Sequence, residues 1–87
     1  MNFLHYEFDA SERDIIRVRL DKQANVRLLD SSNFNDYRSG KAHRYYGGLA
    51  KVSPVDLRPP HYGHWHLVVD LGGYVGTVQA SAEKISG

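Results

Sequence analysis

Apolar and polar residues alternate with a period of two along much of this chain, which is the pattern of half-buried β-strands. The apolar members of these segments are, in chain order, Leu4, Tyr6 and Phe8; Ile16, Val18 and Leu20; Val26 and Leu28; Val55 and Leu57; Trp65, Leu67, Val69 and Leu71; and Val78, Ala80 and Ala82. Residues typical of turns separate the segments, which predicts an all-β domain of six or more strands. Two sheets packed face to face would bury the apolar side of each of these strands. We therefore expect a small antiparallel β-sandwich of jelly-roll type, with a barrel as the alternative.

Residues 30–40, with the sequence DSSNFNDYRSG, depart from this alternation and are rich in turn-forming and capping residues. Ser31 or Ser32 could cap a short helical turn that ends near the glycine of this segment. Such a turn would place Phe34 and Tyr37, three residues apart, on one side. We expect one short helical turn or a compact loop here.

Prolines and glycines suggest where strands end. Pro54 and the pair Pro59-Pro60 bracket the segment 55–57, which suits a short strand at the edge of a sheet. The pairs Gly47-Gly48 and Gly72-Gly73 predict tight turns or bulges, where a Cβ atom would be unfavourable.

The chain has 87 residues, enough for one hydrophobic core, so we expect a single all-β domain over residues 1–87. A domain of this size buries only roughly 60 to 65% of its unfolded surface, which would make a homodimer favourable. The absence of cysteine excludes disulfides, thiolate metal ligands and a cysteine nucleophile. Residues 1–14 lack the features of a signal peptide, and no segment approaches the roughly 20 apolar residues of a membrane span. We expect a cytoplasmic protein without a membrane partner.

Positive charge and histidine gather in the middle of the chain. Residues 38–66 contain five Lys or Arg against one Asp, and four of the five histidines. Such a patch attracts phosphate or another anion. The charges are too few and too dispersed for a nucleic-acid interface, so we interpret the segment mainly as solvated loop surface.

Recognisable catalytic motifs are missing from the sequence. No serine or threonine lies in a strand–turn–helix nucleophile elbow, and Asp56 is the only carboxylate of the basic segment. The glycine pairs do not open a helix after a strand, which excludes a dinucleotide or phosphate loop. We predict that the protein is not an enzyme, and that it has no catalytic residues and no cofactor.

His64 and His66 project from the same side of a predicted strand, because side chains alternate along a strand. A His-x-His pair supplies two metal ligands in many β-barrel metalloenzymes, and His61, His43 or Asp70 could in principle supply a third. No glutamate or histidine lies downstream in a convincing second strand, so the ligand set is incomplete. We predict no metal site, and a small metal-dependent enzyme built on this pair is the alternative.

Aromatic side chains accompany the basic segment and point to a binding surface. Tyr45 and Tyr46 are adjacent, so in a strand they face opposite sides and one of them lies outward. Trp65 shares an apolar face with its strand neighbours and fits the core. Exposed rings beside Arg and His suit recognition of a carbohydrate, a nucleotide or a protein segment. The predicted ligand-binding residues are Arg44, Tyr45, Tyr46, His61, His64 and His66.

Three segments carry a resemblance to a known family: LDKQANVRLLD at 20–30, HRYYGGLAKVSPV at 43–55 and GHWHLVVDLGGYVGTV at 63–78. With these segments the chain resembles the bacterial domain of unknown function family 1883 over nearly its whole length. The resemblance implies a small all-β fold that, in some relatives, is fused to a Toll/interleukin-receptor (TIR) domain of bacterial immunity. It transfers no catalytic or ligand residue. We expect a non-catalytic binding or sensor module, with the metal-dependent enzyme or a structural homodimer as alternatives.

Overall fold

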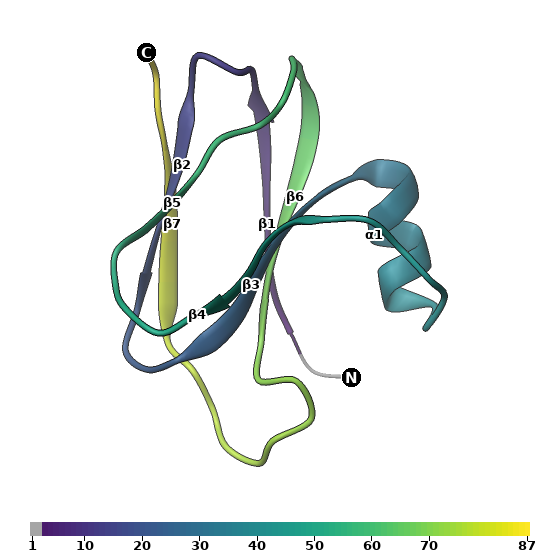
Figure 1. Ribbon diagram of the computed structural model, residues 1–87, viewed down its shortest axis with the longest axis vertical. Coiled ribbons are helices and arrows are strands. Elements are labelled where there is room, and N and C mark those ends of the chain that lie inside the picture. Colours follow the sequence, from purple (N-terminus) through teal and green to yellow (C-terminus); the bar gives the residue numbers. More distant parts are fainter. Residues whose placement is uncertain (1–2) are drawn as a thin grey trace.

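The computed structural model describes residues 3–87, which form two antiparallel sheets packed face to face (Figure 1). The elements are β1 (Leu4–Ala10), β2 (Ile15–Leu20), β3 (Ala24–Asp30), α1 (Ser31–Arg38), β4 (Tyr46–Ala50), β5 (Val55–Leu57), β6 (Gly63–Asp70) and β7 (Ala80–Ile85). One sheet has the order β1-β6-β3-β4 and the other the order β5-β2-β7. The predicted all-β sandwich is confirmed, and the sheets of the described residues do not close into a barrel.

The chain passes back and forth between the two sheets. Among the described elements, only the connection from β3 to β4 stays within one sheet, and this connection carries α1. Strands that are neighbours in the sequence therefore lie mostly in opposite layers. As a result, β1 pairs with β6, although the two strands come from opposite parts of the chain.

The core between the sheets is built from the apolar positions that the alternation identified. Trp65, Leu67 and Val69 of β6 point inward and are buried with Ile16 and Val18 of β2. Each large apolar side chain removed from water in this way contributes roughly 1.5 to 3 kcal/mol of transfer free energy. This burial holds the two sheets together.

Helix α1 covers part of the outer face of the four-stranded sheet, on the side away from β2, β5 and β7 (Figure 1). Its buried residues Phe34 and Tyr37 pack with Leu29 and Val68 in a second apolar cluster. Strand β6 is therefore covered on both faces, which explains why residues 65–70 are all buried.

The structure corrects the predicted helix in length and in its cap. Helix α1 extends over eight residues rather than one turn, and its N-cap is Asp30, not Ser31 or Ser32. The Asp30 side chain accepts a hydrogen bond of 2.8 Å from the backbone N–H of Asn33. The two serines already lie inside the helix, whereas the preceding aspartate retains extended backbone and can reach the free N–H groups. Phe34 and Tyr37 do lie on one buried side, as predicted.

Gly47-Gly48 forms neither the predicted turn nor a bulge, because both glycines lie within strand β4 and pair with β3 in an unbroken register. The expectation that a Cβ atom would be unfavourable is confirmed at Gly47. Gly47 has a φ of 117°, and a Cβ atom built on it would overlap the carbonyl oxygen of Val26 on β3. A close approach between strands thus requires glycine here. The turn at Gly72-Gly73 and the edge position of β5 are confirmed. None of the helical residues that the structure describes forms a segment with the length and apolarity of a membrane crossing.

Candidate functional site

The outer face of the four-stranded sheet holds a group of ionisable side chains beside and partly beneath α1. Strand β1 contributes His5, Glu7 and Asp9, which alternate with inward-facing apolar residues. Strand β6 contributes His64 and His66, and its register places Glu7 opposite His66 and Asp9 opposite His64. We call these five residues the outer-face cluster.

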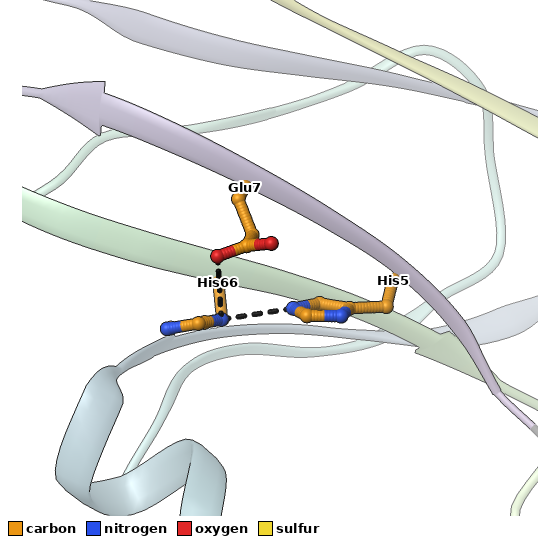
Figure 2. A group of neighbouring side chains, drawn as sticks. All are labelled: His5, Glu7 and His66. Atoms are coloured by element: carbon orange, nitrogen blue, oxygen red, sulfur yellow. Dashed lines mark hydrogen bonds and ion pairs between the residues drawn. The ribbon is translucent and has the colours of Figure 1, made fainter.

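His5 and His66 form the inner part of the cluster (Figure 2). The Nε2 atom of His5 lies 2.8 Å from Nδ1 of His66. The ring centroids are 5.1 Å apart with an interplanar angle of 17°, so the two rings meet edge to edge and share a hydrogen bond. Phe34 of α1 stacks on both rings, with centroids at 4.3 Å from His5 and 4.4 Å from His66. The other His66 nitrogen, Nε2, lies 3.0 Å from the hydroxyl of Ser31.

His64 joins the two carboxylates of the cluster. Its Nε2 lies 2.8 Å from Oε1 of Glu7, and its Nδ1 lies 2.8 Å from Oδ1 of Asp9. The hydrogen bond with Glu7, followed by the one with Asp9, raises the pKa of His64. The hydrogen bond from His64 is also the main reason that the pKa of Glu7 is lowered. Contact with a carboxylate at each ring nitrogen therefore favours the protonated form of the His64 imidazole.

His66 differs from His64 because it is buried. Its side chain is only 9% exposed, whereas that of Glu7 is 53% exposed. Burial, and after it the neighbouring His5, lowers the pKa of His66. A neutral imidazole thus lies beside a solvent-accessible carboxylate, with 3.8 Å between His66 Nδ1 and Glu7 Oε1. This arrangement places an imidazole nitrogen of His66 close to a carboxylate oxygen of Glu7 at the surface.

A second polar network lies on the same face beneath α1, around the buried carboxylate of Asp70. Asp70 accepts hydrogen bonds from Asn25, Arg27, Tyr37 and the backbone N–H of Gly72. Burial by itself would raise the pKa of Asp70, but these hydrogen bonds and the Arg27 charge together lower it. Burial and the hydrogen bond to Asp70 raise the pKa of Tyr37. With four donors the carboxylate is fully occupied, and we interpret this network as structural.

Three of the six predicted ligand-binding residues lie on the outer face. His64 and His66 belong to the outer-face cluster. Tyr45 also lies on this side, where its ring packs against the Arg27 guanidinium at 5.1 Å and against His43 at 5.8 Å. Tyr45 is therefore next to the buried network that contains Arg27.

The other three predicted residues lie elsewhere. Tyr46 and His61 both contact Trp65, whose ring belongs to the opposite face of the sheet, at 6.0 Å and 5.1 Å. Arg44 lies in the loop after α1, where its backbone N–H donates to the Asn33 side chain. The six residues do not form one surface, and ligand binding stays a prediction for all of them: Arg44, Tyr45, Tyr46, His61, His64 and His66.

His5, Glu7 and Asp9 are not among the site residues predicted from the sequence. A signal for them was present, since a polar H-x-E-x-D pattern alternates with apolar residues in the first strand. The pairing of this strand with β6 could not be read from the pattern. The third metal ligands considered for the His-x-His pair lie elsewhere: His43 against Tyr37 and Tyr45, His61 against Trp65, and Asp70 in its own network.

Two hollows lie away from the outer-face cluster. The first, of 390 Å³, opens between the start of β1 and the β6–β7 loop, with Leu4, Val69, Leu71 and Val78 among its lining residues. Its volume is typical of small-ligand pockets, but the polar group Asp70 in its wall is already occupied by its own donors. The second, of 450 Å³, lies beside the exposed side chain of Val75 in the same loop. None of the six predicted ligand-binding residues lines either hollow.

Comparisons with known proteins bear on the family rather than on the activity. No curated protein and no solved structure matches the chain. The family model described as Domain of unknown function (DUF1883) matches residues 1–86, and this match confirms the resemblance found in the sequence. The chain therefore belongs to the DUF1883 family.

Proposed function

We propose that this domain is a non-catalytic binding or sensor module whose recognition surface is the outer-face cluster. The observation that carries the proposal is the set of neighbouring ionisable side chains from β1 and β6 beside α1, in which the buried His66 supports exposed histidine and carboxylate groups. The other half of the same sheet face is apolar at Leu29 and Val68 and is covered by the helix. Ionisable groups with shifted pKa values gather at functional sites more often than at purely structural ones.

The cluster combines accessibility with rigid support. The side chains of His64, Glu7 and Asp9 are 45%, 53% and 69% exposed, so a ligand can reach them. His66 lies beneath them and is fixed by Phe34 and Ser31. Side chains on paired strands are positioned more accurately than side chains on loops, which favours specific recognition.

The sensor part of the proposal is supported by the family resemblance. The resemblance implies that some bacterial relatives are fused to a TIR domain, and in such a chain the DUF1883 module would bind while its partner domain acts. A recognition surface on one sheet face leaves the rest of the sandwich surface available for contact with a partner domain.

Chemical-shift mapping of the ¹⁵N-labelled domain tests the proposal. The probes are ATP, glucose, an unstructured peptide and ZnCl₂, added separately to protein without a histidine tag. We expect at least one probe to shift the backbone amides of Glu7, His64 and His66, and we expect Glu7→Gln to reduce that response. Shifts confined to other residues, such as those beside Arg44 and Tyr45, would overturn the proposed surface. An absence of shifts with all four probes would overturn it as well.

One observation favours a second candidate function, a serine hydrolase. Ser31, His66 and His5 form a hydrogen-bonded chain with distances of 3.0 Å and 2.8 Å, which is the order of nucleophile, base and orienting group. The start of α1 would have to supply the oxyanion donors, but the Asn33 N–H already donates to Asp30. Labelling of wild-type protein by a fluorophosphonate, abolished in Ser31→Ala, would establish this function instead. Unlabelled protein supports the non-catalytic proposal.

A further inference from the structure

We propose that His5, Glu7 and His66 bind a divalent transition-metal ion such as Zn²⁺. This inference rests on the proposed recognition surface and names the ligand of its inner part. Each of the three residues offers one candidate ligand atom, and these three atoms all lie within 4.8 Å of one another. Figure 2 shows the three side chains converging from β1 and β6, with both dashed lines meeting at one His66 nitrogen.

The distances between these atoms fit a common metal ion. Two atoms bound to one tetrahedral zinc ion, each about 2.0 to 2.1 Å from it, are separated by about 3.3 Å. The two histidine nitrogens are 2.8 Å apart, and His66 Nδ1 is 3.8 Å from Glu7 Oε1, so the observed separations lie on either side of that value. The third separation, between His5 and Glu7, is no more than 4.8 Å, so side-chain rotations would be needed to bring all three atoms to coordinating distance.

The three candidate ligand residues also have too few N–H donors to hydrogen-bond to one another. The contact between His5 Nε2 and His66 Nδ1 uses a single N–H as its donor, so neither of these two atoms has an N–H left for the carboxylate of Glu7. Glu7 stays 3.8 Å from His66 Nδ1, beyond hydrogen-bond distance. A cation placed among the three residues could accept one lone pair from each of them.

Neighbouring side chains contact the three candidate ligands and fix their positions, as residues around the ligands of a metal site do. Ser31 lies 3.0 Å from the distal nitrogen of His66, and His64 lies 2.8 Å from the Glu7 carboxylate. Phe34 stacks on the rings of both His5 and His66, with interplanar angles of 18° and 2°. Such contacts fix the orientation and tautomer of ligating histidines and strengthen metal binding.

The donor set indicates the class of metal. Two imidazole nitrogens and one carboxylate suit Zn²⁺, Co²⁺, Ni²⁺ or Fe²⁺, whereas Ca²⁺ and Mg²⁺ prefer oxygen ligands alone. Three protein ligands leave at least one coordination position for water or for a group on a partner molecule. His5 and Glu7 are exposed, so that position would face solvent.

Metal titration of the untagged, EDTA-treated domain tests the inference. Zn²⁺ affinity is measured in competition with a chromophoric chelator, and Co²⁺ binding by its visible absorption. We expect one ion per chain, with His5→Ala and Glu7→Gln weakening Zn²⁺ binding by more than about 100-fold and Ser31→Ala by about 10-fold. The matched controls His43→Ala and His61→Ala remove histidines outside the outer-face cluster, and we expect them to bind as the wild type does.

The outcomes separate this inference from the proposed function. Thermal unfolding first shows that each variant is folded, and both ligand variants change exposed side chains. Wild-type affinity in His5→Ala and Glu7→Gln, or equal losses in the two controls, would overturn the metal site. If Zn²⁺ causes no shift at Glu7 and His66 but ATP, glucose or the peptide does, the metal inference fails and the recognition surface stands. If no probe shifts these amides, both fail.

Discussion

Glu7 and His66 lie directly opposite each other on the paired strands β1 and β6, with 3.8 Å between the carboxylate and the imidazole. One residue comes from the first strand of the chain and the other from the sixth. Their pairing brings His5 and His64 into the same group, since each is two residues from one of them on the same face. The candidate site therefore depends on one strand pairing.

The buried network at Asp70 should be essential for stability. We expect Asp70→Asn to lower the free energy of unfolding by about 3 to 5 kcal/mol, because Arg27 would keep its charge in a largely buried position without a partner. The Asp70 and Arg27 side chains are 1% and 20% exposed. Urea unfolding followed by Trp65 fluorescence measures the change. The control Asp56→Asn breaks an exposed pair with Arg17 and should have little effect. Equal losses in the two variants would contradict this account.

The contribution of Asp70 to the free energy of unfolding should also depend on pH, and it should decrease in acid. The hydrogen bonds and Arg27 hold the pKa of Asp70 below its ordinary value of 3.8, so the folded state binds the proton less readily than the unfolded state. The stabilisation is therefore complete above that value and is lost as the pH falls through the lowered pKa. The difference in unfolding free energy between wild type and Asp70→Asn should be constant from about pH 7 to 5 and shrink below about pH 4. Urea titrations over this range measure it, and a difference that grows in acid would be incompatible with the sign.

Asp30 should stabilise the start of α1. We expect Asp30→Ala to cost about 1 kcal/mol of unfolding free energy, because the N–H of Asn33 loses its acceptor. Asp30→Ser should recover most of this loss, since serine is also a good N-cap. Thermal or urea unfolding of the three proteins provides the test. A serine variant as unstable as the alanine variant would show that Asp30 has another role.

Gly47 should tolerate substitution less well than its neighbour Gly48. Both residues have positive φ values, 117° and 149°, so alanine strains the backbone at either position. Only at Gly47 would the new Cβ overlap the Val26 carbonyl of β3, whereas at Gly48 nothing lies within 4 Å. We expect Gly47→Ala to be the less stable variant and to expose the β3–β4 amides to hydrogen exchange. Equal stabilities of the two variants would contradict this account, because they would mean that β3 and β4 can move apart at Gly47 with no cost in free energy.

The sequence alone determined which side chains share a strand face. Side chains alternate along any strand whatever its partner, so the apolar positions of β2, β3 and β6 identified the core and the sandwich. The spacing of Phe34 and Tyr37 likewise identified the buried side of α1. His64 and His66 were correctly placed together because two residues of one strand separated by one residue always face the same side.

Only the tertiary structure decided which strands are neighbours and which half of the outer face α1 covers. Strand pairing follows from burial across the whole chain and from the order in which it crosses between sheets, and neither is encoded in a local period of two. This is why Glu7 reaches His66 from the far end of the sequence, while Tyr45 and Tyr46 lie on different sides of their sheet. Local alternation specifies a face, and the long-range packing of the sheets specifies what meets on it.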